Sequence, residues 1–183
     1  MSYLITGIIG FLTWTLAEYL LHRFLGHELV KLKKWSKFYR EHAKHHFIFN
    51  YFVSGKDKAM AFVKVGPVLF FLSALISDAP HATVFTGSFL GGYLIYELLH
   101  RRLHLVAPPN RFAAHMRAHH LYHHFVNESV NHGVTTDFWD KVFGTKVEVE
   151  SVAIPVKFKL NWLKEINKGE STQDGYGHTY SIL

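Results

Sequence analysis

Three long apolar stretches alternate with polar, basic segments along this chain of 183 residues: Ser2–Leu21, Ala59–Ser77 and Ala82–Leu99. A helix of about 20 residues extends about 30 Å, which is the thickness of a bilayer core. The first stretch has that length, and the other two are close to the lower limit of about 18 residues. Because only Asp78–His81 separates these two, the pattern predicts one transmembrane helix followed by a transmembrane hairpin.

The first apolar stretch also has the length of a signal peptide. It lacks a preceding basic segment and a small-residue cleavage site, and it runs directly into "HRFLGH", which favours a retained helix. In the hairpin, Pro67 predicts a kink. The sequence "GSFLG" at Gly87–Gly91 permits close contact between helices in lipid.

The basic residues predict the orientation of these helices. Nine Lys or Arg lie between Arg23 and Lys58, and ten lie between Arg101 and Lys168. The remaining one is Lys64, near the start of the second apolar stretch, where its ammonium group is able to reach the interface. The positive-inside rule places both basic regions in the cytoplasm and the Asp78–His81 turn outside. The N-terminus is then expected outside and the C-terminus inside.

The expected fold is therefore all-α. We predict a polytopic integral membrane protein with about three transmembrane helices and a cytoplasmic, histidine-rich helical cap. Residues 1–145 form the membrane domain in this interpretation, and residues 146–183 form a polar C-terminal tail. Since no strong helical period follows Thr145 and Asn167–Leu183 is polar and contains glycine, a mobile tail is expected there.

Histidine dominates the candidate chemistry of the chain. There are 15 histidines against 14 acidic residues, and there is no cysteine. Disulfides and thiolate metal sites are thereby excluded, so any soft-metal chemistry must use imidazole. The net charge of +6 is typical of proteins that bind nucleic acid or anionic membranes. The apolar stretches favour the membrane surface, and no nucleic-acid partner is expected.

The spacing of the histidines follows helix geometry, since residues three or four apart share a helix face. "HAKHH" brings together His42, His45 and His46, "HRRLH" pairs His100 with His104, and "HLYHH" unites three more at positions 120, 123 and 124. "HRFLGH" separates its two histidines by five positions, which an ideal α-helix does not align, so a helix end at Gly26 is expected to turn His27 back. Ten histidines exceed the four to six ligands of one metal ion and suit two.

Other interpretations remain open for these clusters. A solvated histidine-rich face or a pH sensor has the same composition. A bis-histidine haem needs one histidine from each of two helices, for which the HxxHH pairs are redundant. A metal transporter places its ligands near the bilayer midplane, whereas these clusters lie where the predicted spans end. We expect structural or solvated roles for three other histidines: His81, His115 and His178.

From roughly Thr13 to Thr145 the sequence resembles the fatty acid hydroxylase superfamily of membrane di-iron enzymes. "EYLLHRFLGH" is similar to the family's HxxxxH box, and "HAKHH" is similar to its HxxHH box. "YELLHRRLH" is similar to the HxxxH box, and "HHLYHH" to the final HxxHH box. "NHGVTTDFWDKVFGT" resembles the signature that closes the domain. The spacing within and between the boxes is most similar to the fatty acid and sphingolipid 2-hydroxylase branch, without the cytochrome b5 domain that many members carry.

The resemblance implies a metal site and its ligands. The implied metal ligands are His22, His27, His42, His45, His46, His100, His104, His120, His123 and His124. No catalytic residue is implied beyond them. Four further residues are expected to support the ligands by hydrogen bonds or to lie close to the metals: Glu18, Glu97, His119 and His132. An ion pair with Arg101 is the competing expectation for Glu97.

The resemblance also implies the reaction and its partners. The expected activity is O2-dependent hydroxylation of a fatty acid or sphingolipid acyl chain, with C2 as the expected position, by two Fe ions that zinc is able to replace. A carotenoid or sterol hydroxylase or desaturase of the same superfamily is the alternative, and a membrane metal-binding or transport protein is the alternative of another class. The expected partners are the lipid, the membrane and an external cytochrome b5 or ferredoxin. The expected location is the bacterial inner membrane or the endoplasmic reticulum, with the histidines on the cytoplasmic side.

Overall fold

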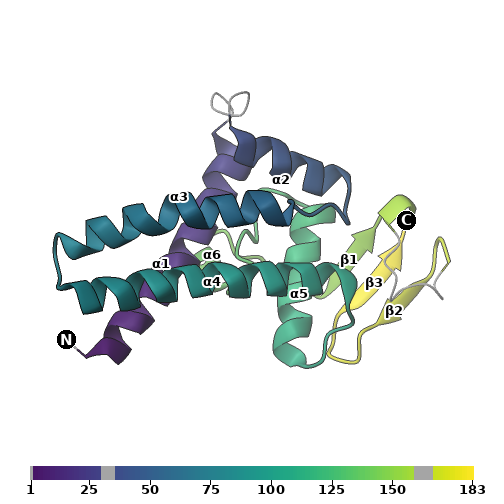
Figure 1. The fold of residues 1–183 in the computed structure, drawn as a ribbon. Helices are drawn as coiled ribbons and strands as arrows, with labels where there is room; N and C mark the ends of the chain where they lie inside the picture. Colours follow the sequence, from purple (N-terminus) through teal and green to yellow (C-terminus); the bar gives the residue numbers. More distant parts are fainter. Residues whose placement is uncertain (1, 30–35, 159–166) are drawn as a thin grey trace.

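The computed structural model describes residues 2–29, 36–158 and 167–183. Five of the basic residues used to orient the predicted helices lie outside these ranges: Lys31, Lys33, Lys34, Lys159 and Lys164. The chain forms long helices first and a small sheet last (Figure 1). The elements are α1 (Tyr3–Leu20), the π-helix η1 (Leu21–Glu28), α2 (Lys37–Phe47), α3 (Gly55–Ala74), α4 (Ala79–Leu105), α5 (Arg111–Phe125), α6 (Phe138–Val142), β1 (Ser151–Ile154), the 3-10 turn η3 (Val156–Phe158), β2 (Ser171–Gln173) and β3 (Thr179–Ile182).

Each of the five longest α-helices begins after a polar residue that caps it. The side chains of these residues accept a hydrogen bond from the backbone N–H three positions later: Ser2, Ser36, Ser54, Asp78 and Asn110. Such a bond satisfies one of the four N–H groups that a helix start leaves without a partner. The caps therefore fix where each histidine-bearing helix begins, and with it the direction of every side chain that follows.

Two helical segments are long and apolar enough to cross a membrane, Tyr3–Glu28 and Ala79–Leu105. They are the first and third of the predicted spans. The helix α3 lies beside α4 in Figure 1 and continues through Pro67. It exposes many apolar side chains, among them Val63, Val68 and Phe71. Its charged first turn and Lys64 shorten the apolar run, so α3 is not among the candidate spans.

Glycines allow α1 and α4 to approach closely. A Cβ atom on Gly10 would lie 2.5 Å from the backbone oxygen of Phe85, and one on Gly92 would lie 2.7 Å from Trp14. These distances are too short for any side chain, so both positions require glycine. The predicted GxxxG pair does not make this contact, because Gly87 and Gly91 face open space within the described structure. The close contact was expected from the sequence, but the residues that make it were not.

The expected mobile tail is wrong, because the described part of the C-terminal segment folds into a three-stranded sheet. Strand order is β1-β3-β2, with β1 parallel and β2 antiparallel to β3. The sheet buries Val152, Ile154, Tyr180 and Ile182 against Leu121 of α5. The chain is thus mostly helical but not all-α. These strands have three or four residues each, which is too short for a clear alternating pattern in a polar sequence.

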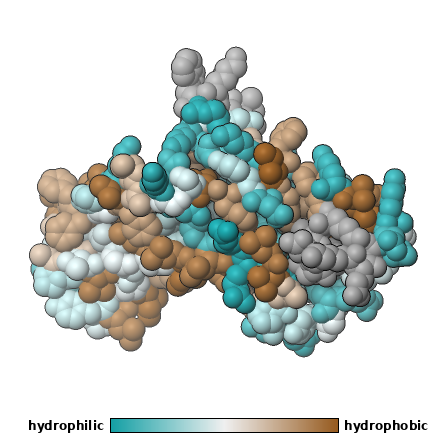
Figure 2. Space-filling view, turned by 45° about the vertical axis from the view of Figure 1, so that its right-hand side comes forward, coloured by the Kyte–Doolittle hydropathy of each residue, from teal (hydrophilic) through white to brown (hydrophobic). Residues whose placement is uncertain are grey.

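The surface reflects two different surroundings. Figure 2 shows apolar side chains on the lobe at the left and across the middle of this face, and hydrophilic ones gathered in the upper part and, mixed with apolar ones, at the right. Exposed apolar residues on α1, α3 and α4 include Ile8, Phe71 and Leu98. Exposed apolar surface on this scale marks a region that contacts a membrane or another protein. The cap of α2, α5 and the sheet lies at the opposite end of α4 from Ala79 (Figure 1).

Candidate metal centre

The ten histidines that the sequence analysis selected gather where α1 and α4 end and meet α2 and α5. They form two groups of five, and within each group the candidate ligand atoms all lie within 4.8 Å of one another. The first group is His22, His27, His42, His46 and His123. The second group is His45, His100, His104, His120 and His124. The sequence had left the division between two sites open.

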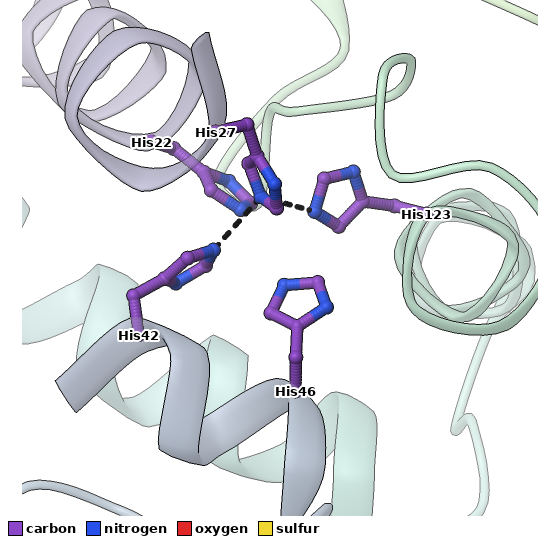
Figure 3. Close-up of side chains that lie close together, drawn as sticks. All are labelled: His22, His27, His42, His46 and His123. Carbon is purple, nitrogen blue, oxygen red and sulfur yellow. Dashed lines mark hydrogen bonds between the residues drawn. The ribbon is translucent and has the colours of Figure 1, made fainter. Parts of the chain in front are cut away.

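The first group joins three segments of the chain. Two of its histidines come from η1, two from α2 and one from α5, and Figure 3 shows their rings arranged around a common centre. The Nε2 atom of His27 lies 2.8 Å from that of His42 and 3.1 Å from that of His123. The rings of His22 and His42 meet edge to face with centroids 4.6 Å apart.

A π-helix aligns the two histidines of this group that are five positions apart. Helices of this type form hydrogen bonds between residues i and i+5, and Leu29 N–H accordingly donates to Phe24 O at 2.8 Å. The rings of His22 and His27 therefore lie together, with centroids 5.3 Å apart. The expected helix end at Gly26 is wrong, since η1 continues to Glu28.

Gly26 has a different function in the structure. A Cβ atom at this position would lie 3.0 Å from Cδ2 of His42 and 3.4 Å from Cδ2 of His22. The missing side chain thus makes room for the imidazole that α2 contributes. The first group needs glycine here for space rather than for an unusual backbone angle.

The second group joins α2, α4 and α5. The ring of His45 lies 4.5 Å, centroid to centroid, from those of both His100 and His104. Nε2 of His120 lies 2.9 Å from Nε2 of His104 and 3.1 Å from Nε2 of His124. The two groups adjoin, because the ring of His46 stacks on that of His124 with centroids 4.1 Å apart.

Neighbouring histidines in the sequence belong to different groups. On α2, His45 lies in the second group and His46 in the first, and on α5, His123 lies in the first and His124 in the second. Consecutive residues of an α-helix point about 100° apart. A helix that runs between two centres therefore supplies both from one HxxHH sequence.

The distances between nitrogens fit the binding of a metal ion. Two imidazoles bonded at about 2.1 Å and at right angles about an ion hold their nitrogens about 3.0 Å apart, and the four shortest Nε2 pairs measure 2.8 to 3.1 Å. The Nε2 atoms of His22, His45 and His46 are buried without a hydrogen-bond partner. Buried polar atoms without partners are costly. An ion in the first group would satisfy those of His22 and His46, and an ion in the second group would satisfy that of His45.

Backbone carbonyl groups fix the orientation of several rings. Nδ1 of His22 donates to the carbonyl oxygen of His132, Nδ1 of His45 to that of Tyr51 at 2.7 Å, and Nδ1 of His123 to that of Val130 at 2.8 Å. With the proton on Nδ1, the lone pair is on Nε2, the atom that faces the group. This is the arrangement that metal-binding histidines usually have.

Burial keeps the imidazoles of the cap neutral. It is the main reason that the pKa values of four histidines of α2 and α5 lie well below the ordinary value, with neighbouring histidines adding to the effect: His42, His120, His123 and His124. Burial also lowers the pKa of His45 to about 4. A protonated imidazole has no free lone pair. Near pH 7 these rings are therefore available as ligands without losing a proton.

The segment 131–145 supports the first group through the buried carboxylate of Asp140. This carboxylate accepts hydrogen bonds from the N–H groups of His132 and Gly133, both at 2.8 Å, from Thr145 Oγ1 at 2.8 Å and from His119 Nε2 at 3.1 Å. It thereby holds the backbone whose carbonyl group orients His22. Asp140 was not among the predicted site residues, although the quoted "WDKVFGT" signature contains it.

The four expected supporting residues have different surroundings. His119 pairs with Asp140 rather than with a ligand histidine. His132 is buried beside the first group, its ring centroid 5.2 Å from that of His123. Glu18 accepts hydrogen bonds from the N–H groups of Val134 and Thr135. Glu97 forms an ion pair with Lys58, a partner that neither expectation named.

The three histidines expected outside the site all pair with nearby carboxylates. His81, in the first turn of α4, lies beside Asp78 at 2.7 Å. His115 lies beside Asp137 at 3.1 Å, and His178 lies beside Asp174 at 3.0 Å in the loop between β2 and β3. None of them belongs to either group of five. Within the described residues, therefore, the spacing of the histidines in the sequence separates the clustered ones from these three.

A cavity of about 440 Å³ opens onto both groups. His22 and His42 of the first group and His45 and His100 of the second line its wall. Much of the remaining lining is apolar or aromatic and comes from α1, α3 and α4: Trp14, Ala61, Phe62, Val65, Phe89, Leu90, Tyr93 and Tyr96. Charged side chains, Lys58 and Glu97 among them, also line it. A long apolar chain is the kind of ligand that such a wall accommodates.

Comparison with known proteins agrees with this site. The fatty acid hydroxylase family model matches residues 7–145. A dihydroceramide fatty acyl 2-hydroxylase of Arabidopsis thaliana is 34% identical over 79% of this chain and 61% of its own length. A ceramide very long chain fatty acid hydroxylase of Schizosaccharomyces pombe is 32% identical over 76% of this chain and 41% of its own length. The chain thus spans less than two thirds of these relatives.

A solved structure gives the same result. It is described as full-length scs7p with only the hydroxylase domain visible, and it matches with a TM-score of 0.62 and 30% sequence identity, over 80% of this chain and 58% of that one. The region matched by the family model contains all ten clustered histidines and Asp140. The resemblance found in the four histidine boxes is therefore confirmed, and the chain belongs to the fatty acid hydroxylase family.

Proposed function

We propose that this protein is an O2-dependent di-iron hydroxylase that inserts a hydroxyl group at C2 of a lipid acyl chain. The observation that carries the proposal is the cavity with apolar walls that opens onto two groups of five histidines. Family membership and the names of the relatives, which are fatty acyl and ceramide hydroxylases, support the same activity.

The two groups of histidines are the proposed ligands of two iron ions. Imidazole is a good ligand for iron, and zinc binds such sites more tightly than ferrous iron does. Zinc in a purified sample would therefore be compatible with an iron enzyme. When bound, iron supplies the activation of O2 that the oxidation of an unreactive C–H bond requires.

The protein's own residues would position the ions and the substrate. The carbonyl groups of Tyr51, Val130 and His132 hold the ligand rings in one orientation, so little reorganisation is needed during the reaction. Trp14, Phe62 and Phe89 line the cavity beside the histidines. An acyl chain in this cavity would exclude water and place one of its carbons in front of the two groups.

We further propose that α3 is a third membrane span and that the metal centre faces the cytoplasm. The exposed apolar side chains of α3, such as Val68 and Phe71, support the span. The basic residues on either side of the hairpin support the orientation. Residues 1–145 would then form the membrane domain, and the segment after residue 145 would cover the cytoplasmic end of α5.

The reaction also needs two electrons from a redox centre outside this sequence. Without cysteine the chain has no ligands for an iron–sulfur cluster of its own. We propose cytochrome b5 or a ferredoxin as the donor. Both types of protein are acidic, and the net charge of +6 supports their attraction to this chain.

Mass spectrometry of lipids from cells that express the protein with a redox partner tests the activity. The control is the double variant His120→Ala/His124→Ala, which removes two members of the second group. We expect an acyl lipid to gain one oxygen at C2 only with the intact protein. Loss of two hydrogens would instead indicate a desaturase. If the iron-loaded protein left all lipids unchanged and consumed no O2, it would only bind metal.

A further inference from the structure

An ion pair lies in the wall of the cavity between its polar and apolar parts. Lys58 in the first turn of α3 pairs with Glu97 of α4, and Tyr93 lies four residues before Glu97 on the same helix. All three residues line the cavity. The side chains of Lys58 and Glu97 are 23% and 19% exposed. Each charge offsets the cost of placing the other in so apolar a wall, and the partly exposed pair lies where a bound lipid would touch it.

The pair divides the cavity into two ends. Farther along α3 and α4 from the pair, toward the turn between them, the lining residues are apolar: Ala61, Phe62, Val65, Phe89 and Leu90. In the other direction lie polar lining residues: Lys37, Glu41 and Tyr51 of α2 and the segment after it, and Asp57 in the first turn of α3, together with Phe38, Phe52 and Val53. This arrangement favours one direction for a lipid with an apolar chain and a polar head.

The pair is also next to the metal centre. Glu97 is three residues before His100, which is about one helical turn, or about 5 Å, along α4. The ring of Tyr96 stacks on that of His100 with centroids 5.4 Å apart. A polar group held by Lys58 and Glu97 would therefore place the neighbouring carbon atoms of the chain beside the second group of histidines.

The charges indicate which polar group fits. In the described part of the chain, each lysine that lines the cavity already has a carboxylate partner, Asp57 for Lys37 and Glu97 for Lys58. A free fatty acid would add another negative charge without an available cation. An amide is neutral, and it offers a carbonyl oxygen to the ammonium group and an N–H to the carboxylate. Both charges of the pair would then keep their partners.

We propose that Lys58 and Glu97 are the positioning residues that bind the amide linkage of an N-acyl lipid and so determine which carbon is hydroxylated. The part of this inference that concerns the hydroxylated carbon rests on the proposed function, whereas the binding of the amide does not depend on it. Lys58 binds the carbonyl oxygen and Glu97 binds the N–H. C2, the carbon next to that carbonyl group, then faces His100 and His45.

Binding is tested with metal-loaded, full-length protein in detergent. The probe is an N-acyl sphingoid lipid with bromine atoms in its acyl chain, which quench tryptophan fluorescence. Trp14 lines the cavity. The difference in quenching between the wild type and Trp14→Phe therefore measures binding of the probe in the cavity. Lys58→Met is expected to weaken binding by about tenfold or more, the usual effect of losing a hydrogen bond to a charged group. The matched control is Lys64→Met, an exposed lysine on the same helix, which should bind as the wild type does.

A second variant separates binding from folding. Lys58→Met alone leaves Glu97 without its cation, whereas Lys58→Met/Glu97→Gln leaves no unpaired charge. We expect the double variant to bind the probe about tenfold or more weakly too, and its hydroxylated products to carry the new oxygen at several positions. Wild-type affinity together with hydroxylation at C2 alone in the double variant would overturn the inference. Binding of the brominated free acid as tightly as the amide would also overturn it.

Failure of the two proposals can be told apart. If the wild type binds the probe in a manner that depends on Lys58 but adds no oxygen to any lipid, the role of Lys58 and Glu97 in binding the amide stands and the proposed function fails. If the wild type hydroxylates at C2 and both Lys58 variants do the same with unchanged affinity, the function stands and the inference fails.

Discussion

The imidazole of His22 donates its Nδ1 proton to the backbone carbonyl oxygen of His132, a residue 110 positions later in the chain. The N–H of Gly133, which lies in the same peptide unit as that carbonyl group, in turn donates to Asp140 at 2.8 Å. A fully buried carboxylate thus orients a candidate metal ligand through one peptide unit. The closing segment of the domain contributes to the metal centre in this way without belonging to either group of five.

Asp140→Asn should weaken metal binding by the first group. The amide nitrogen of asparagine cannot accept the hydrogen bonds that the carboxylate receives from the backbone, so the carbonyl group that orients His22 should move. Losing such support typically costs about 10- to 100-fold in metal affinity. Metal content per chain after dialysis against a graded chelator measures the effect.

Asp137→Asn is the matched control for this experiment. Asp137 lies three residues earlier and pairs with His115, Lys141 and Lys146 rather than with the segment that holds His22. It should retain both metals. If Asp140→Asn bound metal as tightly as the wild type, the orientation of His22 would not depend on the carboxylate.

Adjacent histidines should affect different metals. The double variant His46→Ala/His123→Ala removes two ligands from the first group only, so it should retain about one of two ions. The double variant His45→Ala/His46→Ala removes one ligand from each group and should weaken both sites. Elemental analysis of the purified proteins distinguishes these outcomes. Equal metal content in the two variants would contradict the division into two groups of five.

Gly26→Ala should disturb the first group without removing a ligand. The new methyl group would lie 3.0 Å from the ring of His42, which would have to move. We expect reduced activity and a weaker first metal site, measured as hydroxylated lipid and metal per chain. Gly87→Ala, which adds a methyl group in open space on α4, should leave both unchanged. A fully active Gly26→Ala protein would show that α2 has room to shift.

Ile182→Ala should destabilise the cap. Ile182 is 1% exposed and packs in the cluster that contains Leu121, a residue between two of the candidate ligands on α5. Removing a buried isoleucine side chain costs about 3 kcal/mol of the free energy of unfolding. Thermal unfolding in detergent should show a lower midpoint for this variant. Leu183→Ala, at a residue that is 60% exposed, should match the wild type, and equal midpoints for the two variants would mean that the sheet does not support α5.

The metal-free protein should lose stability as the pH falls. Burial lowers the pKa of His45 and of His132 to about 4, against an ordinary value of about 6.5 in the unfolded chain. Between these values the unfolded state binds more protons, so stability is full above about pH 6.5 and decreases toward pH 4. Each such histidine contributes on the order of 1 kcal/mol per pH unit in this window. Melting temperatures of chelator-treated protein that stayed constant from pH 6.5 to 4.5 would contradict this expectation.

The sequence was sufficient to select the clustered histidines, because helical spacing and position at the ends of apolar stretches are local properties. It was not sufficient to divide them. Whether His45 and His46 serve one ion or two depends on what lies on each side of α2, which is a property of the packing. The alignment of His22 with His27 depends on a π-helix, and a local sequence seldom specifies one.

Contacts between distant segments explain the other differences. Asp140 has the appearance of an ordinary surface carboxylate in the sequence, and only the folded chain surrounds it with the N–H groups of residues 132 and 133. The strands near the C-terminus are polar and very short. Their few apolar side chains, Tyr180 and Ile182 among them, are buried because they pack against Leu121 of α5. The local sequence does not reveal this contact, so it does not predict the strands.

His45 and His46 are adjacent but belong to different groups, and so are His123 and His124. This arrangement restricts insertions and deletions within α2 and α5. One residue inserted within α2 would rotate everything after it by about 100°, and both centres would lose a ligand at once. The same holds for α5. Insertions and deletions should therefore be tolerated between the histidine-bearing helices but not inside them, and the two centres are expected to be gained or lost together over evolutionary time.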